Sequence, residues 1–221
     1  MWCCLCDDLS ADKGVASAAN DRKDVHSSRT PAPLGQSLYR LIADMENCHP
    51  WHLSEPASPD GRILDARIFR YGLPVSDETG PFSISVKNPG QPLKFSFGAF
   101  DYLVVEHRLA MQLESIAPSD IELFPATVEG DPSYAIVNVA TQIACIDEEQ
   151  TIGTKWRADD HRPDRIGHYR SINKLVVDPS KVGGHEVFRI TGQASFLIVS
   201  DTVRQLLERE AGPGLRFITV C

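Results

Sequence analysis

Two segments of the chain repeat one pattern, and this repeat limits the possible folds more than any other sequence feature. The segments are YLVVEHRLAMQLE at residues 102–114 and FLIVSDTVRQLLE at residues 196–208. Each holds a short apolar run, a polar pair and then apolar residues at helical spacing. The match runs without a gap at a shift of 94 residues and continues beyond the quoted letters, where Ala117 meets Ala211. The repeat therefore predicts two related strand–helix–strand units.

The second unit carries a clear signal for each of its elements. FLIV is typical of a strand buried on both faces. Ser200 and Asp201 offer N-cap oxygens for the first helical amides. The GPG at residues 212–214 ends the helix, and LRFITV alternates like a half-buried strand. We predict an α+β fold with a mixed sheet and few helices, built around units at about residues 95–128 and 189–221.

The rest of the chain divides by composition. Residues 1–33 are polar and rich in small side chains, which predicts a flexible N-terminal tail. We expect residues 34–221 to form a single domain, with an N-terminal portion (34–92) and a core portion (93–221). Within the N-terminal portion, RILDARIFRYGLPV at residues 62–75 is interpreted as a strand.

A long insertion separates the two units. SYAIVNVATQIACID predicts one or two strands, and RSINKLVVD predicts another. The segment between them, EEQTIGTKWRADDHRPDRIGHY, is charged and lacks a clear period. Such a segment is typical of an exposed functional loop.

Bulk composition excludes several classes of protein. The 221 residues carry a formal net charge of −8, and no basic patch favours nucleic-acid binding. No apolar run is long enough for a membrane span, and the N-terminus does not resemble a secretory signal, so we expect a cytoplasmic protein. Three of the six cysteines lie in the first six residues, a spacing that fits reduced thiols better than a disulfide framework or a zinc site.

One group of residues could be read as an active site. Asp159, Asp160, His161 and His168 lie close in sequence and could act as acid–base groups or metal ligands. Their spacing matches no zinc pattern, and the arginines between them favour surface salt bridges instead. The chain also lacks a nucleophile elbow, a P-loop and a dinucleotide-binding turn. We therefore predict no catalytic, metal-binding or cofactor-binding residues, and no cofactor.

The same segment has the composition of a protein-binding surface. Carboxylates next to aromatic side chains suit a protein partner, because aromatic residues supply contact area and charges steer the encounter. A basic enzyme such as a nuclease would fit this surface. In the alternative interpretation, the tryptophan packs into the core and the acids face water. The candidate partner-binding residues are Asp147, Glu148, Glu149, Trp156, Asp159, Asp160 and Tyr169.

The second half of the chain holds a recognisable set of motifs: Asn138-Val139, Cys145-Ile146-Asp147, the segment 178–189 and the segment 198–217. With these motifs it resembles the eleventh family of bacterial immunity proteins from polymorphic toxin systems, formerly a domain of unknown function. The resemblance extends over about residues 36–221, and the cysteine-bearing start departs from the family pattern.

This resemblance implies a protein that binds a cognate toxin and neutralises it by forming a stoichiometric complex. It brings no catalytic residues with it, and it leaves the toxin and the oligomeric state open. Two alternatives remain at this point. One is an enzyme with a site near Asp159, Asp160, His161 and His168, and the other is a stand-alone interaction module.

Overall fold

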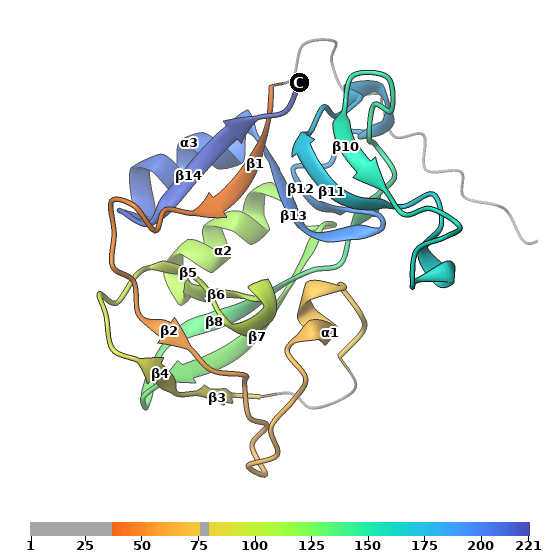
Figure 1. Cartoon of the computed structure of the whole chain (residues 1–221). Helices are drawn as coiled ribbons and strands as arrows, with labels where there is room; N and C mark the ends of the chain where they lie inside the picture. Colours follow the sequence, from red (N-terminus) through yellow and green to blue (C-terminus); the bar gives the residue numbers. More distant parts are fainter. Residues whose placement is uncertain (1–36, 76–79) are drawn as a thin grey trace, which may run out of the picture.

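The computed structural model describes residues 37–75 and 80–221 (Figure 1). The tail predicted over residues 1–33 lies outside the described residues. The described part is mostly β, with four sheets and three α-helices, so the predicted α+β class is confirmed. The helices are α1 (Arg67–Arg70), α2 (His107–Ile116) and α3 (Asp201–Glu210), and the 3₁₀ turns are η1 (Ala99–Asp101), η2 (Pro163–Arg165) and η3 (Pro179–Lys181).

The first five-stranded sheet combines the start of the described chain with its end. Its order is β14 (Leu215–Thr219), β1 (Leu38–Ala43), β13 (Gln193–Ser200), β12 (Val187–Ile190) and β9 (Gln142–Ile143). Its neighbours are antiparallel except for β9, which runs parallel to β12. Strand β1 therefore lies between the two strands of the second predicted unit.

The second five-stranded sheet repeats much of this arrangement. Its order is β3 (Phe82–Ile84), β7 (Ile121–Val128), β8 (Asp131–Val139), β6 (Leu103–Glu106) and β5 (Phe95–Phe97). Here β8 lies between β6 and β7 and is antiparallel to both, as β1 is to β13 and β14. Two small sheets complete the fold, one made of β2 (His52–Leu53) and β4 (Val86–Asn88), the other of β10 (Ile152–Lys155) and β11 (Tyr169–Lys174).

Strand, helix and strand occur in both predicted segments. Helix α3 begins and ends 94 residues after α2, which is the shift found in the sequence. The start of α3 is capped as predicted, because the Ser200 hydroxyl accepts a hydrogen bond from the Val203 N–H at 3.2 Å. The corresponding cap residue of α2, Glu106, makes no such bond. The relatedness of the two units stays a prediction.

Both helices pack their apolar faces into one core shared by the two large sheets. Leu109 and Leu113 of α2 and Leu206 and Leu207 of α3 belong to this cluster. Alternate residues of β13 face opposite ways, with Leu197 in the shared core and neighbouring side chains in a further cluster on the other face. The strand is thus buried on both faces, as its apolar run predicts.

The strand predicted over residues 62–75 is wrong, because the structure has the short helix α1 there. Phe69 is fully buried and packs against other aromatic rings on the outer face of the second sheet. Gly72 follows the helix with φ +59°, and a Cβ there would lie 2.3 Å from the Val139 carbonyl oxygen. The chain therefore turns away from α1 in direct contact with the end of β8.

Candidate partner-binding site

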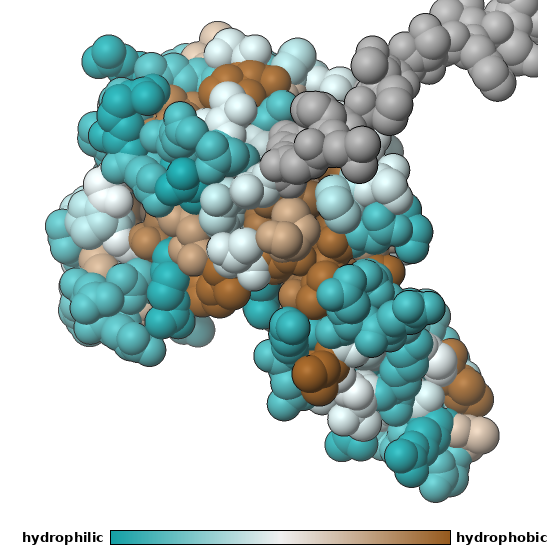
Figure 2. Space-filling model, turned by 90° about the horizontal axis from the view of Figure 1, so that it is seen from above, coloured by the Kyte–Doolittle hydropathy of each residue, from teal (hydrophilic) through white to brown (hydrophobic). Residues whose placement is uncertain are grey.

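The predicted excursion forms a hairpin arm, which we define as residues 152–174. Strands β10 and β11 pair antiparallel at its base. The Trp156 N–H donates to the His168 carbonyl and the Gly167 N–H donates to the Trp156 carbonyl, so the tip of the arm is closed by the backbone. The arm lies at the side of the first sheet in Figure 1, and Figure 2 shows it as a mainly hydrophilic lobe standing out from the body.

In the turn at residues 147–150, just before the arm, one of the three acidic side chains stabilises the turn itself. The Asp147 carboxylate accepts the backbone N–H groups of Glu149 and Gln150 and the side-chain amide of Gln150. These bonds, the one from the Gln150 side chain above all, lower the pKa of Asp147. Glu149 makes no side-chain hydrogen bond or ion pair within the described chain, so its exposed carboxylate is available to a partner.

The second acid of the turn ties it to the arm. Glu148 pairs with Lys155 and accepts a hydrogen bond from the Tyr169 hydroxyl at 2.9 Å. The bond from Lys155 is the main reason why the pKa of Glu148 is lowered. Tyr169 is only 8% exposed, so it supports the base of the arm and offers little surface to a partner.

Trp156 lies on the arm and is half-buried there, outside the three main core clusters. Its ring is nearly perpendicular to the His161 ring, with 5.4 Å between the two ring centres. The Arg170 guanidinium carbon lies 5.0 Å from the centre of the Trp156 ring. Asp160 accepts the Arg157 backbone N–H and lies 3.6 Å from Arg170. The structure thus brings Trp156 and Asp160 together through Arg170, while the exposed Asp159 has no such partner within the described chain.

The arm itself is basic, although the chain as a whole is acidic. Residues 152–174 hold six basic side chains against three acidic ones. The basic residues are Lys155, Arg157, Arg162, Arg165, Arg170 and Lys174, and the acidic ones are Asp159, Asp160 and Asp164. The acidic character that the sequence suggested for this segment is confined to the turn at residues 147–149 and to these three aspartates.

The residues of the possible active site do not form a metal-binding group. His161 packs on Trp156, and Asp160 is engaged by Arg170, while His168 faces a different cavity. Within residues 37–75 and 80–221, no cluster of three or more histidine, cysteine or acidic side chains could hold a metal ion.

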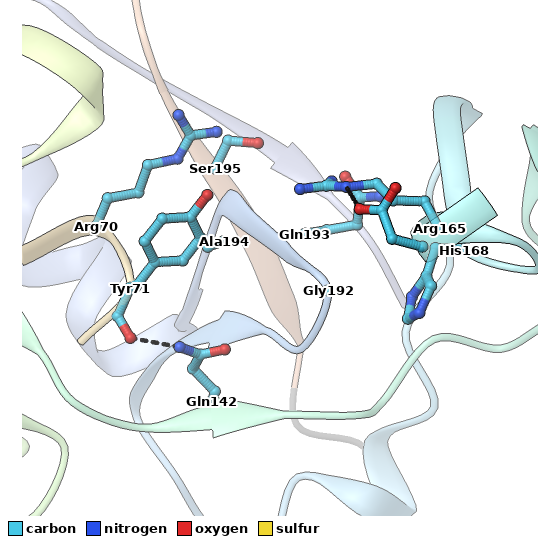
Figure 3. A pocket seen from close by; sticks show the side chains of 10 residues that line it. Arg70, Tyr71, Gln142, Arg165, His168, Gly192, Gln193, Ala194 and Ser195 are labelled. Atoms are coloured by element: carbon cyan, nitrogen blue, oxygen red, sulfur yellow. Dashed lines mark hydrogen bonds and ion pairs between the residues drawn. The ribbon is translucent and has the colours of Figure 1, made fainter. Parts of the chain in front are cut away.

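A polar pocket, which we call the arginine pocket, lies where the arm meets the body. It has a volume of about 360 Å³, and Figure 3 shows Arg70 and Tyr71 on one side and Arg165 and His168 on the other. The turn between β12 and β13, with Gly192 and Gln193, lies between these walls. Short sequence patterns do not reveal this pocket, because its residues come from four segments that are far apart along the chain. The remaining residues that line it are Gln142, Asp164, Ala194 and Ser195.

The family-like motif positions have structural roles near this pocket. Buried Asp120 contacts His185 and accepts the backbone N–H groups of Glu186 and Val187, which joins the two large sheets. Arg189 is fully buried and donates to the carbonyls of Ala194 (2.6 Å) and Asp101 (2.9 Å). Burial lowers its pKa to about 10. Of these residues, Arg189 bears on the pocket, because it holds the backbone of the lining residue Ala194.

Comparison with known families decides what kind of protein this is. A family model described as the immunity protein family (Imm11) matches residues 56–221. The chain belongs to this family. The resemblance predicted from the sequence is thereby confirmed, although the match begins later than the expected residue 36. No curated protein matches the chain.

The family match includes the arm, all three α-helices and both predicted units, but strand β1 precedes it. Membership of the immunity family supports an interaction with a protein toxin. Among the described residues, no helix is both long and apolar enough to cross a membrane.

Proposed function

We propose that this immunity-family protein neutralises a cognate toxin by forming a stoichiometric complex with it. The observation that carries this proposal is the family match over residues 56–221. The exposed arm supports it, because the arm combines a half-buried tryptophan with side chains of both charges. Such a surface suits specific recognition, in which aromatic side chains supply affinity and charges select the partner.

The proposed contact surface is the arm together with the turn at residues 147–150. Glu149 and Asp159 are exposed and make no side-chain bond within the described residues, and the half-buried Trp156 adds aromatic surface. Asp147, Glu148, Asp160 and Tyr169 hold the local structure through the bonds described above. A nuclease toxin remains our prediction for the partner class, since exposed carboxylates can occupy sites meant for phosphates.

Co-expression with the product of the adjacent gene tests the function. We expect cells that make this toxin to survive when the immunity protein is present, and the purified proteins to form a complex of fixed stoichiometry by light scattering. Growth inhibition that persists despite abundant immunity protein, with no complex in vitro, would contradict the proposal.

Charge reversal tests the contact surface. Glu149→Lys and Asp159→Lys should slow association with a basic toxin, and the effect should shrink as salt rises, because exposed charges are screened. Glu148 is a poor choice here, since reversing it would also release Lys155 and Tyr169. Glu46→Lys is the control, because Glu46 is exposed, lies outside the arm and makes only a surface ion pair with Arg216 (3.3 Å). Equal association rates for all three variants would place the contact elsewhere.

A further inference from the structure

The arginine pocket has more positive than negative charge on its walls. Arg70 comes from α1, Arg165 from η2 and His168 from the segment just before β11. The one acidic residue of the lining, Asp164, is already engaged: Arg162 donates two hydrogen bonds to it, at 2.9 and 2.8 Å. These bonds lower the pKa of Asp164 to about 2, so its carboxylate is neutralised by Arg162 rather than by the pocket.

Both arginines of the pocket keep unused donors. Arg165 lies 4.0 Å from Asp164, and Arg70 lies 3.9 Å from Asp101, so neither makes a close charge-assisted hydrogen bond to a carboxylate there. The Nε of Arg70 is buried and has no hydrogen-bond partner. This Nε is out of reach of a ligand, so an incoming oxygen acceptor pairs instead with the terminal nitrogens of Arg70, whose side chain is 26% exposed. In Figure 3 the Arg165 side chain extends across the pocket toward the wall that carries Arg70.

The walls are held in place by bonds from the pocket's neutral residues. The Gln142 amide donates to the Tyr71 carbonyl, which fixes the end of α1 against β9. The Gln193 amide donates to the Tyr169 carbonyl at 2.7 Å, which fixes the base of the arm against the β12–β13 turn. The backbone beside Arg70 and the base of the arm that carries Arg165 are thus tied to the body. Pre-organised donors lower the cost of ordering side chains on binding.

From this geometry we infer that the arginine pocket receives an aspartate or glutamate side chain of the toxin. A guanidinium matches a carboxylate in shape and can donate two parallel hydrogen bonds to it. The inference rests on the proposed function. The acidic turn at residues 147–149 favours a basic patch on the toxin, and the arginine pocket adds an acidic side chain as a second contact on the toxin. A free small carboxylate would offer the same chemistry. The pocket lies at the foot of a projecting arm, however, so a protein that approaches it contacts the arm and the body at the same time.

The test in the complex compares two double variants. Arg70→Gln with Arg165→Gln removes both pocket charges, whereas Arg108→Gln with Arg209→Gln removes two exposed charges from α2 and α3. We expect the pocket variant to weaken toxin binding by about 30-fold or more, because unpairing a desolvated carboxylate is costly. The control should stay within about twofold. Wild-type neutralisation with unchanged affinity of the pocket variant would overturn the inference.

A second measurement does not depend on the toxin. Signals of the arginine Nε–H groups can be followed by NMR while N-acetylglutamic acid α-amide, which has one side-chain carboxylate, is added. The signals of Arg70 and Arg165 should shift and saturate, and the neutral glutamine analogue should leave them in place. Shifts no larger than that of exposed Arg209 would overturn the inference, even where no toxin binds. Failure of the wild-type protein to bind its toxin counts instead against the proposed function. If the double variant does not fold, Arg165→Gln alone is measured in its place, because Arg165 lies on the exposed arm.

Discussion

The glycine after α1 gives the sharpest test of how the pocket wall is built. Gly72 has φ +59°, and a Cβ there would meet the Val139 carbonyl oxygen at 2.3 Å and the Ala140 Cα at 3.0 Å. Both obstacles are backbone atoms, so no side chain can rotate away. Gly130 in the turn between β7 and β8 has φ +84°, but its added Cβ would meet nothing within 4 Å. Comparing alanine substitutions at Gly72 and Gly130 therefore separates the cost of a left-handed backbone from the cost of a steric clash at the added Cβ.

The two substitutions should therefore differ in size. Gly130→Ala carries only the left-handed strain, about 1 kcal/mol in the free energy of unfolding. Gly72→Ala adds an overpacking cost of similar or larger size, for a total of about 3 kcal/mol. For a chain of this length these values correspond to falls in Tm of about 2–4 °C and about 6–12 °C, respectively.

Thermal and urea unfolding of both variants, followed by circular dichroism, measure these differences. Because Gly72 lies two residues after Arg70, we also expect Gly72→Ala to weaken carboxylate binding in the arginine pocket. Equal destabilisation by the two substitutions would refute the reasoning, since it would mean that the end of α1 does not press against β8.

Three further outcomes follow from contacts described above. Ser200→Ala should lower stability by about 1 kcal/mol through loss of the α3 cap, whereas Glu106→Ala at the uncapped start of α2 should cost less than about 0.5 kcal/mol in urea unfolding. Cys145 is buried, which raises its thiol pKa to about 11, so iodoacetamide at pH 8 should label exposed Cys221 and leave Cys145 intact in peptide mass spectra. The same shift stabilises the fold below pH 9, the ordinary pKa of a thiol, and this contribution should fade as pH rises toward 11. Trp156→Ala should weaken toxin binding at least tenfold but change Tm little, which calorimetry of the complex and of the free protein can separate.

Local patterns were enough to predict the strand–helix–strand elements of the two units. The apolar run ending at Val199 and the cap at Ser200 give signals that depend only on near neighbours, and the structure has a strand and a helix there. Helix α1 was missed for the opposite reason. It has four residues, too few to show a helical period, and its sequence RIFR also suits a strand. Packing of Phe69 in the aromatic cluster decides its conformation.

The candidate site was predictable only in part. The excursion was recognised from its charge and its lack of a period, and the exposure of Glu149 and Asp159 agrees with that interpretation. The pocket could not be found in this way. Arg70 and Arg165 are 95 residues apart, and what brings them together is the register of the sheets and the fold of the arm. Short sequence patterns do not indicate which distant residues lie close together in the folded chain.

Strand β1 has a consequence for the order in which the molecule can be completed. It is translated well before both of its neighbours, because β1 ends at residue 43 whereas β13 and β14 lie between residues 193 and 219. Leu38 pairs with Ser200 and Ala43 with Leu215, so the first large sheet cannot close until β13 and β14 have been made. Contacts between such distant residues slow folding. A chain cut short before β13 would leave β1 without its partners, and it would be a substrate for chaperones and proteases.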